Sequence, residues 1–126
     1  MAGKFVIDNA KNGEFYFNLK AGNGEIILTS EMYKAKPSAL NGIESVRKNS
    51  QDASKFEKRE AKDGRGYFVL KATNGQEIGR SQYYKSDSGL DNGIASVTKN
   101  APDAELVDLT AEKRDLNFED GEKNVK

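Results

Sequence analysis

One nine-residue phrase occurs twice in this chain. Residues 41–49 read NGIESVRKN and residues 92–100 read NGIASVTKN, so the second copy follows the first after 51 positions. The same shift aligns the two halves without a gap and leaves about half of the aligned positions identical. A match of this length indicates an internal duplication, which predicts that both halves share one local structure.

The duplication also predicts the domain organisation. Strand-like segments at residues 5–7, 56–58 and 107–109 align under the shift, and no linker rich in Pro, Gly or Ser separates the halves. We therefore expect one pseudo-twofold domain over residues 1–110, with repeat one at about 4–54 and repeat two at about 55–110. The junction strand should belong to both copies and lie at the centre of one sheet. The charged residues 111–126 are expected to form a flexible tail.

Each repeat begins with a pattern typical of strands and hairpins. Phe15, Phe17 and Leu19 alternate with other residue types, the period of two of a half-buried strand. Four turn pairs divide the strand-like runs: Asn12-Gly13, Asn23-Gly24, Asp63-Gly64 and Asn74-Gly75. Such pairs favour the positive φ angles of a two-residue hairpin. Each repeat therefore predicts a three-stranded meander.

The repeated phrase itself predicts a helix. Ala39, Ile43 and Val46 are spaced i, i+4 and i+7, and the second copy keeps this apolar stripe. A glycine within a helix costs ~1 kcal/mol relative to alanine. Close approach of helix to sheet would explain the glycine, whereas a backbone opened to a ligand is the alternative. The residues expected at the helix–sheet contact are Gly42, Ile43, Val46, Gly93, Ile94 and Val97.

At this point the motifs resemble a known family. NG-[EQ]-x-I-x-x-S-x-x-Y-K, followed by NGI-x-SV-x-KN, is similar to the YegP-like proteins, an uncharacterised bacterial family, over roughly residues 4–110. The resemblance implies an α+β fold in which two tandem β-β-β-α-β repeats form a single antiparallel sheet. It also implies two helices packed on one face and closing strands exchanged between the repeats. It brings no activity, cofactor or substrate.

Composition excludes several function classes. Twenty basic and twenty acidic residues cancel, so the chain lacks the net positive charge that drives binding to nucleic acid or anionic membranes. The absence of Cys and His removes thiolate nucleophiles, the commonest metal ligand and Ser-His or Cys-His catalytic pairs. We therefore expect no enzyme activity and no cofactor. The start of the chain has no apolar run typical of a signal peptide, which favours the cytoplasm.

The first candidate site is a duplicated polar segment before each helix. TSEMYK at 29–34 and RSQYYK at 80–85 share the residues Ser30/Ser81, Tyr33/Tyr84 and Lys34/Lys85. Because amide groups at a helix N-terminus attract anions, hydroxyls and lysines there could surround a phosphate or carboxylate. The alternative is structural: the serine satisfies backbone groups at a turn and the tyrosine covers the entrance of the helix.

The second candidate site comes from a difference between the halves. If Phe17, Leu19 and Ile27 face the helix, the opposite face of repeat one carries Val6, Tyr16, Ile26 and Leu28. The equivalent residues of repeat two are Glu57, Tyr67, Glu77 and Gly79. An exposed apolar patch predicts a docking surface or self-association. Scattered surface hydrophobic residues, or cover from residues 111–126, are the alternatives.

Three functions are compatible with these observations. The leading interpretation is a non-catalytic protein-interaction or binding module of the bacterial cytoplasm, with an unknown protein partner or self-association. The alternative is a small-molecule or anion binder that uses the serine, tyrosine and lysine loops. Nucleic-acid binding is a weaker alternative, in which Tyr16 and Tyr67 would stack on bases. No membrane partner is expected.

Overall fold

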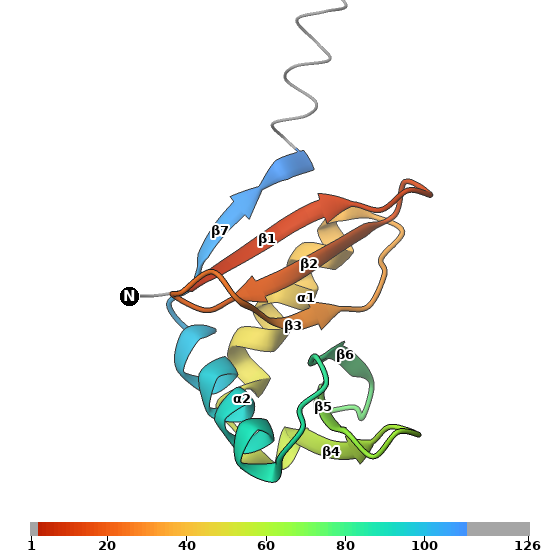
Figure 1. The fold of residues 1–126 in the computed structure, drawn as a ribbon. Helices are drawn as coiled ribbons and strands as arrows, with labels where there is room; N and C mark the ends of the chain where they lie inside the picture. The colour runs from red at the N-terminus through yellow and green to blue at the C-terminus, as the bar shows by residue number, and fades with distance from the viewer. Residues whose placement is uncertain (1–2, 111–126) are drawn as a thin grey trace, which may run out of the picture.

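A computed structural model describes residues 3–110 of the chain (Figure 1). Residues 111–126, expected from the sequence to form a tail, lie outside the described residues. The elements are β1 (Lys4–Asn9), β2 (Phe15–Lys20), β3 (Ile26–Ser30), α1 (Lys36–Asn49), the 3₁₀ helix η1 (Ala53–Lys55), β4 (Phe56–Glu60), β5 (Gly66–Lys71), β6 (Glu77–Arg80), α2 (Asp87–Asn100) and β7 (Glu105–Asp108). The α+β class and the two β-β-β-α units are as predicted.

One seven-stranded sheet holds both repeats. Its strand order is β4-β5-β6-β3-β2-β1-β7, so the two meanders meet where β3 pairs with β6. Neighbouring strands are antiparallel except β1 and β7, which are parallel. The expected sheet was antiparallel throughout, and this one pair corrects it. No hairpin joins β7 to β1, so the antiparallel direction that a hairpin requires is not imposed on this pair.

The junction strand β4 lies at an edge of the sheet, not at its centre (Figure 1). The expectation of a shared central strand is therefore wrong, because β4 serves as the opening strand of the second meander and pairs with β5. Within residues 3–110, the expected exchange of closing strands is seen for β7 only. β7 follows repeat two along the chain but pairs with β1 of repeat one.

All four predicted turns place their glycine at a positive φ angle. The angles at Gly13, Gly24, Gly64 and Gly75 lie between 86° and 91°. In the first turn, the Ala10 N–H donates to the Glu14 carbonyl at 2.7 Å, so three residues form the loop. The predicted two-residue hairpin is thus one residue too short, since a three-residue loop needs only its glycine in the left-handed region.

A β-bulge changes which side chains of β3 face the core. Leu19 lies opposite Leu28, but Lys20 lies opposite Ile26, so Ile27 is the extra residue. Ile27 and Leu28 are both buried, and only Ile26 points outward, with 43% of its surface exposed. The prediction that Leu28 lies on the open face is therefore wrong. One inserted residue shifts the period-two alternation of everything that follows it.

The glycines of the repeated phrase lie where a tyrosine ring presses on the helix. A Cβ added to Gly42 would come within 2.9 Å of Tyr33 Cζ and 3.1 Å of Phe17 Cε2. A Cβ on Gly93 would meet the equivalent atoms of Tyr84 and Phe68 at 2.6 and 3.1 Å. Of the four apolar residues expected at this contact, Ile43, Val46 and Val97 are buried, whereas Ile94 packs against the core from a partly exposed position.

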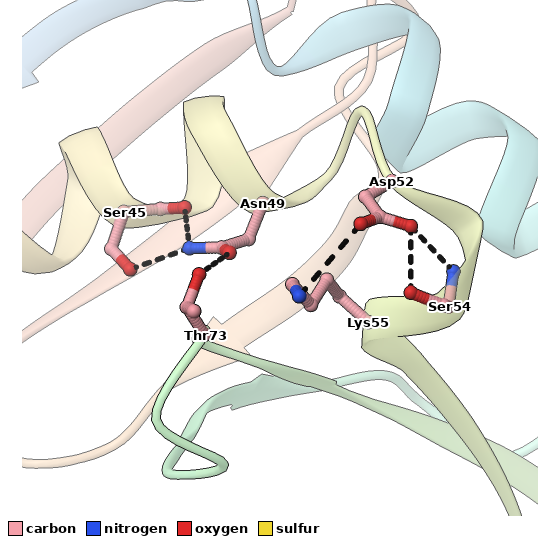
Figure 2. Close-up of polar contacts among 6 residues, drawn as sticks. All are labelled: Ser45, Asn49, Asp52, Ser54, Lys55 and Thr73. Atoms are coloured by element: carbon pink, nitrogen blue, oxygen red, sulfur yellow. Dashed lines mark hydrogen bonds and ion pairs between the residues drawn. The ribbon is translucent and has the colours of Figure 1, made fainter.

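The asparagine at the end of the phrase forms hydrogen bonds within its own helix in both repeats and, in repeat one, also with a hairpin of the sheet. The Asn49 amide donates to the Ser45 carbonyl at 2.9 Å and to the Ser45 hydroxyl at 3.0 Å (Figure 2). Thr73, in the turn between β5 and β6, donates to the Asn49 side-chain oxygen at 3.5 Å. The C-terminal end of α1 in repeat one is thereby fastened to a hairpin of repeat two.

Candidate functional site

The face of the sheet that carries no helix differs between the repeats. In repeat one it presents a group of apolar and aromatic side chains, which we call the repeat-one face: Val6, Tyr16, Ile26, Val107 and Leu109. Val107 of β7 stands beside Val6 of β1 in the parallel register. Val6, Val107 and Leu109 line a hollow of about 400 Å³. This face is therefore both apolar and concave.

Two lysines stand at the rim of this hollow. Lys4 projects from β1 and Lys20 from β2, and both contribute to its lining. Neither forms an ion pair within residues 3–110. The repeat-one face thus combines exposed apolar surface with positive charge that no carboxylate of the described residues neutralises.

The same face of repeat two carries a salt-bridge network. Arg59 bonds to Glu57 at 3.0 Å and to Glu77 at 2.8 Å. Lys71 reaches Glu57 at 2.5 Å, and Arg80 lies 3.6 Å from Glu77. Hydrogen bonds from Arg59 and then Lys71 lower the pKa of Glu57 from 4.5 to about 2. Each charged side chain of this network therefore has an oppositely charged partner within the protein.

This network also covers the apolar atoms of repeat two. Val69 of β5 lies on the same face as Glu57, its partner in the strand register, yet none of its surface is exposed. Arg80 lies over the ring of Tyr67 at 5.4 Å, and the Tyr83 ring contacts Tyr67 edge-on, 5.4 Å between centroids. Tyr67 therefore already has a cation and a ring against it, which leaves little room for a stacked base.

Comparison of equivalent positions shows what creates the difference. Val6 stands where repeat two has Glu57, and Ile26 stands where it has Glu77. Two carboxylates of repeat two are thus replaced by aliphatic side chains in repeat one. The exchange removes negative charge from this face and adds apolar surface to it.

The lysine of the network is kept in both repeats. Lys20 is equivalent to Lys71, which bonds to Glu57, but in repeat one valine replaces that carboxylate. Lys20 was not among the residues predicted from the sequence, although comparison of residues 20 and 71 would have revealed it. Val107 and Leu109 were not predicted either, because only the strand pairing brings them to this face.

The serines of the duplicated loops serve the backbone. The Phe17 N–H donates to Ser30 Oγ at 2.9 Å, and this hydroxyl donates to the Glu31 carbonyl at 2.8 Å. The Phe68 N–H and the Gln82 carbonyl make the same two bonds to Ser81, at 2.9 and 2.7 Å. Both serines are buried. Their hydroxyl protons are therefore committed to bonds inside the fold.

The tyrosines of these loops pack against the core. The Tyr33 ring stacks on Phe17 and the Tyr84 ring stacks on Phe68, with centroids 6.3 Å apart in each case. Burial, and then the nearby Glu31 carboxylate, raise the pKa of the Tyr33 hydroxyl. Each tyrosine thus covers a helix glycine from the loop side, in keeping with the structural alternative.

The lysines of the loops remain exposed. Lys34 and Lys85 have no ion-pair partner in the part of the chain that the structure describes. Lys85 lines a hollow of about 330 Å³ beside Asp87, whose carboxylate lies in the first turn of α2. A negative charge there opposes an anion at the helix N-terminus. Anion binding at these loops remains a prediction that rests on the two lysines.

Metal-binding clusters and membrane-spanning helices were the two remaining features to consider in the described residues. Between residues 3 and 110, no group of three or more Asp and Glu side chains could hold a metal ion. In the same range, neither helix has the length and apolar character needed to cross a membrane.

Known proteins share both the sequence and the fold. A family model described as "Domain of unknown function (DUF1508)" matches residues 10–57 and again residues 61–108. A UPF0339 protein of Pseudomonas aeruginosa is 58% identical over 108 residues, which cover 86% of this chain and 98% of that protein. The UPF0339 protein YegP of Yersinia pestis is 53% identical over 108 residues, with coverages of 86% and 96%.

Two solved structures extend this comparison to three dimensions. The solution NMR structure of a UPF0339 protein from Shewanella oneidensis has a TM-score of 0.82 and 49% identity, and the match covers 86% of this chain and 92% of that one. The solution NMR structure of YegP from E. coli also has a TM-score of 0.82, with 48% identity and coverages of 86% and 93%. Two matched repeats, similar sequences and a shared fold place this chain in the DUF1508 family, together with YegP and the other UPF0339 proteins.

Proposed function

We propose that this chain is a non-catalytic protein-interaction module whose contact surface is the repeat-one face. The supporting observation is the difference between Lys71, which bonds to Glu57 at 2.5 Å, and its equivalent Lys20, which has Val6 in place of that carboxylate. An apolar hollow with unneutralised lysines at its rim suits a protein segment that carries apolar side chains flanked by carboxylates. The cytoplasmic location expected from the sequence remains a prediction.

Alternative occupants are less well matched to this surface. Nucleic acid would need positive charge along its phosphates, whereas the chain has no net charge and Tyr67 already lies against Arg80. A small polar ligand would need converging hydrogen-bond groups, but the lining of the hollow combines aliphatic side chains with two lysines and glycine backbone. A protein segment can use both the apolar and the charged components.

The proposal is tested by giving repeat one the residues of repeat two. Val6→Glu with Ile26→Glu supplies carboxylates near Lys20 and removes exposed apolar surface. The double variant should remain folded and should capture the partner from native bacterial lysate at least about tenfold more weakly than the wild type. The matched control, Glu57→Gln with Glu77→Gln, alters the equivalent positions of repeat two and should retain the partner. Equal loss in both variants would contradict the proposal.

A further inference from the structure

The internal symmetry predicts a strand position that the described chain does not fill. β7 lies outside β1 and pairs with it in parallel. The shift of 51 residues makes β4 the equivalent of β1, so a strand equivalent to β7 would lie outside β4. No strand within residues 3–110 pairs with that outer side, because β4 is the last strand of the sheet. We call this side of Phe56–Glu60 the β4 edge.

The backbone of the β4 edge is oriented for strand pairing. The Phe68 N–H donates to Ser81 Oγ and the Phe68 carbonyl accepts from the Ser81 N–H, both at 2.9 Å, so the backbone of Phe68 faces β6. Lys58 lies opposite Phe68 in the antiparallel register. Hydrogen-bonded and non-bonded pairs alternate between such strands, so the backbone N–H and carbonyl of Lys58 point outward. Its equivalent, Ile7, is paired with β7.

Apolar side chains beside the β4 edge are less covered than their equivalents beside β7. Phe5 and Ile43 are 0% and 2% exposed, whereas their equivalents in repeat two, Phe56 and Ile94, are partly exposed. Phe56 and Ile94 line a hollow of about 660 Å³. Three lysines contribute to the same lining: Lys55, Lys58 and Lys71. Each of these lysines already has a carboxylate partner: Asp52 for Lys55, Asp91 for Lys58 and Glu57 for Lys71. The vacant strand position therefore has an apolar floor bordered by ion-paired lysines.

The 3₁₀ helix η1 limits where a strand can begin. Asp52 caps it by accepting from the Ser54 N–H at 2.9 Å and the Ser54 hydroxyl at 2.7 Å (Figure 2). The Phe56 N–H donates to the Ala53 carbonyl, which ends this turn, so it is not available to an added strand. Between Phe56 and Lys58, the groups left for an added strand are then the Phe56 carbonyl and both backbone groups of Lys58. One residue of a parallel strand, opposite Glu57, would donate to the Phe56 carbonyl and accept from the Lys58 N–H, and the residue two positions later would donate to the Lys58 carbonyl.

We propose that the β4 edge binds an extended segment of a partner protein as an eighth strand, parallel to β4. The β1–β7 register defines its chemistry, because Glu105 lies opposite Lys4 and Leu106 opposite Phe5. The bound segment would accordingly carry an acidic residue opposite Lys55, followed by an apolar residue against Phe56 and Ile94. This is strand addition to an open sheet edge. It does not depend on the repeat-one face, since β4 and β7 lie at opposite edges of the sheet.

The sequence of β7 provides the probe. A capped peptide with the sequence of residues 104–109, AELVDL, is titrated into the ¹⁵N-labelled full-length protein. Saturable shifts are expected at the amides of the β4 edge and at Ile94, with the β1 amides unchanged. A peptide with lysine in place of the first leucine is the control and should not bind. Shifts confined to β1, or the absence of saturation up to the solubility limit, would overturn the proposal.

Two variants at one position separate the backbone from the side chain. Lys58→Pro removes the outward N–H at an edge position where proline is tolerated. It should lower the affinity for the peptide by about tenfold or more. Lys58→Ala keeps the N–H and should bind within about threefold of the wild type. If Lys58→Pro does not fold, Ile94→Glu replaces it and should also abolish binding. Self-association of the free protein that Lys58→Pro removes, or nuclear Overhauser effects between β4 and residues 111–126, would assign the edge to another occupant and overturn the proposal.

Discussion

Leu28 and Gly79 are equivalent residues of the two repeats, and the side chain of Leu28 occupies the space beside the missing Cβ of Gly79. A Cβ added to Gly79 would lie 3.0 Å from both Cγ and Cδ2 of Leu28. The two residues belong to β3 and β6, the strands that join the repeats. One large side chain therefore fills the seam where two symmetric leucines would collide.

This relationship predicts compensation between the two positions. Leu28→Gly should lower the free energy of unfolding by about 3–5 kcal/mol, because it empties a fully buried site. Adding Gly79→Leu should recover a large part of that loss, since the new side chain enters the same space from the other repeat. Urea denaturation of the wild type, both single variants and the double variant measures this coupling. Additive losses would contradict a shared space.

A second prediction concerns the helix glycines. Helix propensity alone predicts that Gly42→Ala stabilises the protein by about 1 kcal/mol. The structure predicts the opposite, a loss of about 1–3 kcal/mol, because the new Cβ would collide with the stacked Tyr33 ring. In a Tyr33→Ala background the same substitution should become stabilising. Thermal unfolding of the wild type, Gly42→Ala, Tyr33→Ala and the double variant shows whether the added Cβ stabilises or destabilises the protein.

A third prediction separates structural serines from ligand-binding serines. Ser30→Ala removes the acceptor of the buried Phe17 N–H and should lower the free energy of unfolding by about 1–3 kcal/mol without any ligand present. Ser81→Ala should do the same through Phe68. The control is Ser38→Ala on the exposed start of α1, for which a change within about 0.5 kcal/mol is expected. A neutral Ser30→Ala would contradict this structural role of the serine.

A fourth prediction follows from Glu57. Its pKa is about 2 in the folded protein, against an ordinary value of 4.5, so the unfolded chain binds the proton first as the pH falls. The stabilisation from this carboxylate is complete above about pH 4.5 and is lost as the pH falls toward about 2. The urea midpoint of Glu57→Gln should therefore fall less over this interval than that of the wild type. Glu25→Gln, in an exposed hairpin, should follow the wild-type curve.

Most of the fold was predictable because the repeat doubled each local signal. Four turn pairs, two apolar helix stripes and one constant shift agreed on two β-β-β-α units in one sheet. Leu28 was misplaced for a specific physical reason: the bulge at Ile27 shifts the alternation, and counting by twos along β3 does not detect an inserted residue. The edge position of β4 was missed because sequence equivalence identifies like strands without identifying their partners.

The candidate site was predictable only in part. The exchange of Glu57 and Glu77 for Val6 and Ile26 was visible in the aligned halves, and the structure places both apolar residues on the open face. The contribution of β7 was not visible, because a parallel pair between Val6 and Val107 joins residues at opposite ends of the chain. The role of Lys20 could not be predicted from the sequence, because it becomes evident only by comparison with the ion pair between Lys71 and Glu57.

The proposed function requires that the repeat-one face binds a protein and that its counterpart in repeat two does not. A photo-crosslinking amino acid placed at Ile26 or, in a second variant, at the equivalent Glu77 distinguishes the two faces after irradiation in living cells and mass spectrometry. We expect a protein adduct from position 26 alone, on a segment where carboxylates flank apolar residues. Equal adducts from both positions, or adducts to nucleic acid only, would contradict the proposed contact surface.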